Sequence, residues 1–278
     1  MSRLQSFGPL IMGSLLLISG PVRAEEWQPK TLADGQPDVQ GFWHTQMQGT
    51  YSLNNPRNGG GGRPPKWFLA KREGKQGPVR PSRISDPADG QVPYQPWARE
   101  KQKYIEGNID KPVKQEFIDP QARCFPDGVT RTQWWHEYEI RQYPGYVVFV
   151  FDAAVRIVSI SDKPHIPSKI KLWMSDSRGR WEGNTLVIDV TSSNSKHRLS
   201  NEGDFASDNV HITERLTFSD TNTYTYQATY DDPSVYTRPW TVTSKQIRGH
   251  ANDPGYEFLE YACVEGERNA QEISASAK

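Results

Sequence analysis

The stretch Asp176–Thr191, DSRGRWEGNTLVIDVT, decides the fold class of this chain. Within it, Thr185–Thr191, TLVIDVT, is rich in β-branched and apolar side chains, which is typical of a strand. The positions Asp176–Gly179 and Gly183-Asn184 predict tight turns, because Asp, Asn and Gly adopt turn conformations at little steric cost. We therefore expect short β-strands joined by turns in this part of the chain.

Similar strand patterns cover the second half of the chain. The segment Tyr138–Asp152, YEIRQYPGYVVFVFD, predicts a hairpin that turns at Pro144-Gly145. Because closure removes exposed strand edges, the pattern favours an antiparallel lipocalin-like β-barrel over residues 121–270 rather than a sandwich. Further strands are expected at Val155–Ser161, Lys169–Met174, His211–Ser219, Thr223–Tyr230, Trp240–Ile247 and Tyr256–Cys263.

The N-terminus has the pattern of a secretory signal peptide over residues 1–24. Arg3 supplies a positive start, Leu10–Ile18 an apolar run, and Val22-Arg23-Ala24 small residues before a cleavage point. The alternative is a retained membrane anchor, but the run is shorter than the roughly 20 residues of a spanning helix. We expect a periplasmic or secreted protein without a membrane span.

Residues 25–120 predict a long irregular arm that packs on the barrel. Asn54–Pro65, NNPRNGGGGRPP, has the composition of a flexible loop, and Trp97–Asn108 is the best candidate for a short helix. Gly41-Phe42-Trp43 resembles the Gly-x-Trp tripeptide that opens lipocalin-like barrels. At the other terminus, residues 271–278 predict a disordered tail.

The composition argues against some classes of function. The chain has 33 acidic and 33 basic residues, whereas a nucleic-acid-binding protein is expected to carry a basic excess. Two cysteines in an exported chain, Cys124 and Cys263, predict one disulfide. A redox pair or a metal site has less support, because the cysteines lack a Cys-x-x-Cys spacing and the histidines lack ligand spacing.

Phrases spread over nearly the whole chain resemble a large family of secreted bacterial proteins of uncharacterised function. They include PDVQGFW at Pro37–Trp43, CFPDGVTR at Cys124–Arg131, DSRGRWEGNTLVIDVT at Asp176–Thr191 and DDPSVYTRPWT at Asp231–Thr241. The resemblance implies secretion and a lipocalin-like barrel with a long N-terminal arm, and it implies no established activity. The chain differs from the family pattern at Asn184, usually acidic, and at Val264, usually histidine.

His165 is the first candidate for acid–base chemistry. Flanking prolines stiffen its backbone, and a positioned neutral imidazole is an effective base near neutral pH. Asp176 and Glu182 lie near Trp173 and Trp181 in the sequence, and a carboxylate beside an aromatic ring can act as a general acid. The structural alternatives are a histidine bonded to a turn, an Asp176 that caps a turn, and a Glu182 paired with an arginine.

Glu214 is a further candidate. It adjoins Arg215 on an expected strand, so the two side chains face opposite sides and one must point into a closed barrel. A buried carboxylate needs a cationic partner, for which Arg156 and Arg238 are candidates. The pair is either a structural ion pair or the polar end of a ligand cavity. The residues expected to bind substrate are Tyr138, Arg156, Trp173, Asp176, Trp181, Arg238 and Trp240.

These patterns favour an enzyme without a cofactor or metal. The sequence has no nucleophile elbow, phosphate-binding loop or dinucleotide fingerprint. We expect a lyase, isomerase or hydrolase in which His165, Glu182 and Glu214 act on a small or medium aromatic or sugar-derived substrate in a barrel cavity. The alternatives are a lipocalin-like carrier of an apolar small molecule and a structural or envelope-interaction module. The oligomeric state stays open.

Overall fold

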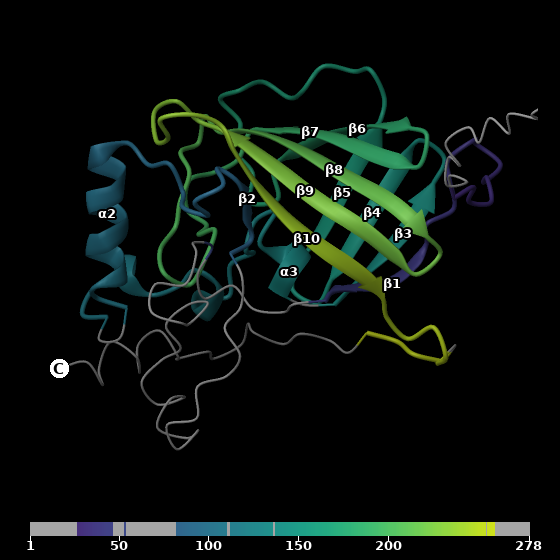
Figure 1. Ribbon diagram of the computed structural model, residues 1–278, viewed down its shortest axis with the longest axis horizontal. Helices are drawn as coiled ribbons and strands as arrows, with labels where there is room; N and C mark the ends of the chain where they lie inside the picture. Colours follow the sequence, from purple (N-terminus) through teal and green to yellow (C-terminus); the bar gives the residue numbers. More distant parts are fainter. Residues whose placement is uncertain are drawn as a thin grey trace, which may run out of the picture.

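The computed structural model describes residues 27–46, 53, 82–109, 112–135, 137–253 and 255–258. In this part of the chain nine strands form a closed barrel (Figure 1), as the sequence predicted. Each strand is hydrogen-bonded to the next in the order given, and the last pairs with the first to close the barrel. They are β1 (Gly41–Thr45), β3 (Tyr138–Tyr143), β4 (Tyr146–Phe151), β5 (Val155–Ile160), β6 (Asp176–Glu182), β7 (Thr185–Thr191), β8 (His211–Asp220), β9 (Thr223–Asp231) and β10 (Trp240–Arg248).

One pairing departs from the expected antiparallel order, because β5 and β6 run parallel. A parallel pair needs a crossover connection, and residues 161–175 provide it. The strand predicted at Lys169–Met174 is therefore wrong, since this segment contributes only a bridge between Leu172 and Ser193. The turn predicted at Asp176–Gly179 is also wrong. These residues begin β6, where a Cβ on Gly179 would lie 2.7 Å from side-chain atoms of both Val158 and Ile160.

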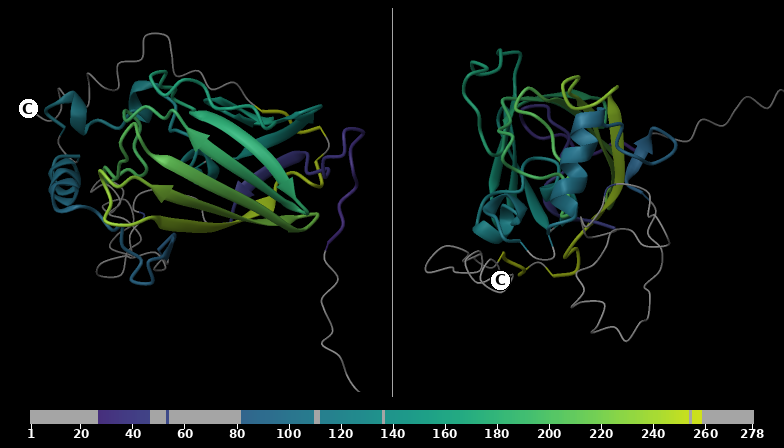
Figure 2. Two further views of the ribbon diagram at one scale, coloured as in Figure 1. Left: turned by 90° about the horizontal axis from the view of Figure 1, so that it is seen from above. Right: turned by 90° about the vertical axis from the view of Figure 1, so that its left-hand side faces the viewer.

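The predicted arm contributes to the barrel as well as packing on it. β1 lies inside this segment, yet it pairs with both β3 and β10. β2 (Ile84–Asp86) pairs with the start of β10, whereas β1 pairs with its end. The predicted helix is confirmed as α2 (Pro96–Glu106), which lies across one end of the barrel (Figure 2). The predicted signal peptide and tail lie outside the described residues. None of the described helices is long and apolar enough to cross a membrane.

Short helical segments connect α2 to the first hairpin of the barrel. They are two 3-10 helices, Gln115–Phe117 and Gln121–Arg123, and the short helix α3 (Thr132–Trp135). The hairpin of β3 and β4 then turns at Pro144-Gly145 as predicted, and Gly145 adopts a φ of +76° that suits glycine. These connections bring residues 112–125 to the same end of the barrel as the start of β6, where Phe125 stacks on Trp173.

Aromatic side chains make up much of the buried core. Tyr230 stacks on Trp240 with ring centroids 4.3 Å apart, and Trp43 meets Tyr224 edge-on at 5.0 Å. Each fully buried side chain of this size contributes on the order of 2 to 3 kcal/mol through removal of apolar surface from water. The largest buried aromatic side chains are Trp43, Trp134, Tyr138, Phe149, Phe218, Tyr224, Tyr226, Tyr230, Tyr236 and Trp240.

Candidate functional site

The barrel interior contains an ion pair between Arg156 on β5 and Glu214 on β8. Both side chains are fully buried, and the guanidinium donates to both carboxylate oxygens, at 3.1 Å for one of them. Ser177 accepts from the guanidinium at 3.1 and 3.0 Å, and the Tyr226 hydroxyl donates to Glu214 at 2.6 Å. Of the two arginines proposed as partners for Glu214, the structure selects Arg156.

Two other expected site residues, Tyr138 and Trp240, also lie in the barrel interior. The Tyr138 hydroxyl hydrogen-bonds that of Tyr224, and burial raises the pKa of Tyr138 well above its usual value. Trp240 is fully buried against Tyr230. Tyr138 and Trp240 thus pack with other protein side chains in the core, and the polar groups around Glu214 are bonded to one another.

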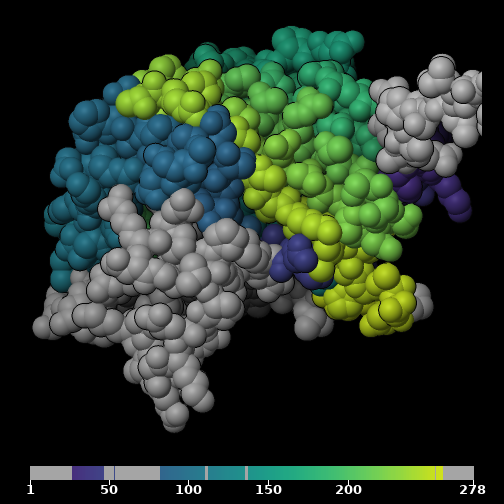
Figure 3. Space-filling view, viewed as in Figure 1, coloured from purple at the N-terminus to yellow at the C-terminus, as the bar shows by residue number. Residues whose placement is uncertain are grey.

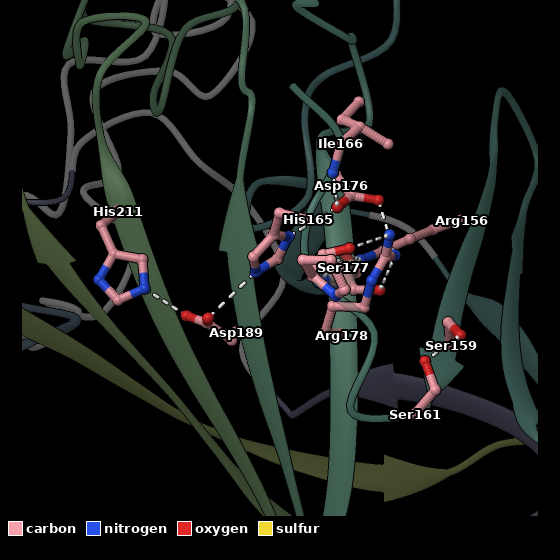
Figure 4. Close-up of polar contacts among 11 residues, drawn as sticks. Arg156, Ser159, Ser161, His165, Ile166, Asp176, Ser177, Arg178, Asp189 and His211 are labelled. Atoms are coloured by element: carbon pink, nitrogen blue, oxygen red, sulfur yellow. Dashed lines mark hydrogen bonds and ion pairs between the residues drawn. The ribbon is translucent and has the colours of Figure 1, made fainter. Parts of the chain in front are cut away.

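His165 lies on the outer face of the barrel between two carboxylates (Figure 4). Its Nδ1 is 2.6 Å from Asp176 at the start of β6, and its Nε2 is 3.0 Å from Asp189 on β7. His211 on β8 bonds the other oxygen of Asp189, and Arg178 donates to Asp176 at 2.7 Å. Burial opposes ionisation of Asp189, but hydrogen bonds from His211 and His165 outweigh it and lower its pKa.

The three expected catalytic residues do not lie in one site. His165 contacts Asp176 and Asp189 through its two ring nitrogens on the outer face of the barrel. Glu182 lies at the far end of β6 and is exposed, where hydrogen bonds from Arg180 and Arg215 lower its pKa. Glu214 is inside the barrel. The three side chains therefore share no cavity in which they could transfer protons to one substrate.

The remaining expected residues are also dispersed. Arg238 is exposed and pairs with Asp86 of β2 on the outer side of the barrel. Trp181, at the end of β6 away from α2, is partly buried and donates to Gln36 at 3.3 Å. Trp173 lines a pocket.

That pocket lies where α2 covers the end of the barrel and has a volume of about 530 Å³. Phe125 and Trp173 form one wall as a parallel stack with ring centroids 4.7 Å apart. Phe205 forms another, and the Lys101 ammonium lies 4.2 Å from the centre of its ring. The lining residues come from α2, from residues 116–125, from the crossover and from the loop after β7: Lys101, Ile105, Glu116, Ile118, Pro120, Arg123, Phe125, Trp173, Ser195, Lys196, His197, Arg198, Gly203 and Phe205.

Positive charge dominates this lining. Among the described lining residues Lys101, Arg123, Lys196 and Arg198 are cationic, whereas Glu116 is the one carboxylate. Arg198 is more than nine-tenths buried and donates to the backbone carbonyl of Glu116. Burial lowers its pKa, Asp119 opposes this effect, and the neighbouring Arg131 and Arg123 reinforce it. A bound anion would offset the repulsion among these cations.

His197 contributes a neutral ring to the same lining. Burial lowers its pKa to about 4, and the backbone at Asn194 offsets only part of this effect. The ring lies so close to Gly128 that a Cβ there would be 2.6 Å from its Cδ2. His197 therefore packs the pocket wall without adding charge at neutral pH.

The described residues contain no group of three or more His, Cys, Asp or Glu that could hold a metal ion. Cys124 follows the helix Gln121–Arg123 beside the pocket. Its predicted partner Cys263 lies outside the described residues, so the disulfide between the two stays a prediction.

Comparison with protein-family models, with characterised proteins and with solved structures finds no match for this chain. The family resemblance of the sequence therefore stays a prediction, and the geometry of the site carries the argument on function.

Sequence reasoning missed most of the pocket. Lys101, Arg123, Phe125 and Arg198 were not candidates, because they come from segments distant in sequence and share no spacing. The one available signal was CFPDGVTR at Cys124–Arg131, a phrase outside the strands that combines an aromatic residue with charges.

Proposed function

We propose that the protein binds a small anionic molecule with an aromatic or other planar group in the pocket beside α2. The observation that carries the proposal is a set of four cations and one carboxylate around an aromatic-walled pocket. Ligand pockets typically have volumes of about 300 to 1,000 Å³ and combine apolar walls with a few polar anchors. The pocket of about 530 Å³ has this size and this chemistry.

Two kinds of contact would hold such a ligand. Guanidinium and ammonium groups of Arg123, Arg198 and Lys101 would bind its carboxylate, sulfonate or phosphate, and charge-assisted hydrogen bonds of this kind are the strong ones. The faces of Phe125 and Trp173 would pack against its planar part. The proposal is thus a form of the carrier alternative, with an anionic rather than a purely apolar ligand. The predicted signal peptide supports action outside the cytoplasm.

Titration with the anionic dye anilinonaphthalene sulfonate tests the proposal. We expect fluorescence to report saturable binding to the wild type, and the double variant Lys101→Gln/Arg123→Gln to bind at least about tenfold more weakly, because two charge-assisted contacts are lost. The matched control is Arg180→Gln/Arg215→Gln, which removes two exposed arginines around Glu182. Circular dichroism and the melting temperature check that each variant is folded.

Two results would contradict ligand binding at this pocket. One is equal weakening of dye binding in the control variant. The other is equally tight binding of thioflavin T, a planar cationic dye, because a cation-lined pocket should reject a cationic ligand.

Acid–base catalysis is the second candidate function. The observation in its favour is the pairing of His165 with Asp176, since a carboxylate bonded to one ring nitrogen orients an imidazole for proton transfer at the other. His165 would first have to release Asp189. Its test is a screen of chromogenic esters and glycosides, in which His165→Gln should lower kcat by roughly 100-fold or more. Unchanged turnover in a folded variant would show that His165 has a structural role and no catalytic one.

A further inference from the structure

Exposed aromatic side chains lie on α2, which contributes to the pocket lining, and on the pocket wall itself. Trp97 and Tyr104 on α2 are 53% and 47% exposed, and Phe125 on the pocket wall is 40% exposed. Large aromatic side chains are usually covered in soluble proteins, and a group of exposed ones marks a contact surface. Trp97, Tyr104 and Phe125, together with the lysines and arginine beside them, are termed the collar here.

Contacts connect the α2 part of the collar to the pocket and to the neighbouring segment at Phe117. Trp97 and Lys101 are four residues apart on α2, so they share a helix face, and both contact the ring of Phe205 in the pocket. Tyr104 lies one turn further along and packs on Phe117 with ring centroids 5.2 Å apart. Figure 3 shows α2 in blue at the surface of this end of the molecule.

The charge of the collar is positive although the chain as a whole has a net charge of zero. Lys101, Arg123 and Lys196 lie at the pocket, and none of them makes an ion pair with a carboxylate of the described residues. Lys101 lies four residues from the exposed Trp97, and the Arg123 guanidinium lies 5.3 Å from the centre of the exposed Phe125 ring, whereas Tyr104 is bonded to the ion pair of Lys114 and Glu116. Exposed aromatic rings beside cations match the interface of a bilayer, where such rings lie among the head groups and cations meet anionic lipid.

We propose that the collar docks on an anionic lipid surface and that the pocket takes up its ligand there. The partner is a bilayer with phosphate-bearing, negatively charged head groups, and the ligand is an anionic amphiphile whose head group reaches the cations of the pocket. This inference deepens the proposed function, because it names the source of the ligand. The contact is peripheral, with aromatic rings at the head-group level and no spanning segment.

Vesicle co-sedimentation tests the docking. We expect the protein to bind vesicles of equimolar phosphatidylcholine and phosphatidylglycerol at least about tenfold more tightly than vesicles of phosphatidylcholine alone, since each cation near an anionic surface adds about fivefold. Added sodium chloride should weaken this binding, because salt screens exposed charges. Trp97→Ala should weaken it by roughly tenfold through loss of the inserted ring.

Tyr146→Ala is the matched control, because Tyr146 is 45% exposed on the outer wall of the barrel, away from α2. Its vesicle binding should equal that of the wild type. Equal loss in this control, equal binding to both vesicle types, or no vesicle binding at all would overturn the lipid proposal. A dimer in sedimentation equilibrium that Trp97→Ala dissociates, without vesicle binding, would assign the collar to a second copy of the chain instead.

Vesicle binding and dye binding test the docking proposal and the pocket proposal independently. Trp97 does not line the pocket, although it packs on Phe205, which does. Because the cations and the stack of Phe125 on Trp173 remain, Trp97→Ala should bind anilinonaphthalene sulfonate within about threefold of the wild type. Dye binding that persists without vesicle binding overturns the docking and leaves the pocket in place. Vesicle binding without dye binding overturns the pocket, and with it the uptake of a ligand from lipid.

Discussion

The barrel interior and the pocket beside α2 both contain arginines next to aromatic rings, but they differ in what the arginines bind. Inside the barrel, Arg156 is bonded to Glu214 and Ser177, and the Tyr226 hydroxyl donates a hydrogen bond to the Glu214 carboxylate. At the pocket, Arg198 and its cationic neighbours face one carboxylate and an open space. The comparison teaches that residue types alone do not mark a binding site. The difference lies in charge balance, because the interior arginine is neutralised by a carboxylate, whereas the pocket lining has four cations for one carboxylate.

The comparison first predicts a large difference in stability between breaking and replacing the interior pair. Glu214→Ala should lower the free energy of unfolding by about 3 to 5 kcal/mol, because Arg156 is left as an unpaired buried charge. Urea unfolding followed by tryptophan fluorescence measures this change.

The double variant Arg156→Met/Glu214→Leu provides the control for this prediction. It should recover most of the lost stability, because apolar side chains of similar volume replace the pair without leaving a charge. A double variant at least as unstable as Glu214→Ala would contradict the view that the pair can be replaced by apolar side chains.

The second prediction concerns the pH dependence of stability through His197. Its pKa is about 4 in the folded protein against an ordinary 6.5, so below pH 6.5 the unfolded chain binds a proton that the folded protein does not. The wild type should therefore lose up to about 3 kcal/mol relative to His197→Phe as pH falls from 6.5 to 4. Urea unfolding at several pH values measures the difference between the two proteins. A stability difference that does not change with pH would show that His197 has the same pKa in the folded and unfolded protein.

The third prediction separates the outer cluster from the pocket. His165→Ala removes two hydrogen bonds to carboxylates and should cost about 1 to 2 kcal/mol of unfolding free energy. The affinity for anilinonaphthalene sulfonate should stay within about twofold of the wild type, because Leu172 independently anchors Trp173 through its bridge to Ser193. Dye titration checks this, and a large loss of affinity would show that the crossover couples the two regions.

Strand alternation and hairpin turns predicted most of the barrel because they are local signals. The hairpin at Pro144-Gly145 and the strands β8, β9 and β10 follow directly from period-two patterns. The parallel pairing of β5 with β6 could not be predicted, since it depends on contacts between distant segments. Gly179 illustrates the difficulty, because a glycine in a tight strand contact looks like a turn in the sequence.

The buried ion pair was partly predictable and the pocket was not. Glu214 is two residues from both Ile212 and Leu216, so it shares their buried face and needs a cation. The sequence prediction left open whether Glu214 or Arg215 points inward, and whether Arg156 or Arg238 pairs with Glu214. The pocket depends on α2 meeting the crossover and the loop after β7, where Lys101, Trp173 and Arg198 approach one another only in the fold. No periodicity connects these residues.

Tryptophan indole N–H resonances measured during titration with anilinonaphthalene sulfonate test the central claim most directly. Trp173 lines the proposed pocket, whereas Trp43, Trp134 and Trp240 are buried in the core. A Trp173→Phe variant assigns the key resonance. The account predicts that the Trp173 resonance shifts with added dye while those of Trp43, Trp134 and Trp240 stay in place. Shifts at the core tryptophans with none at Trp173 would contradict this account and would indicate that the ligand binds inside the barrel.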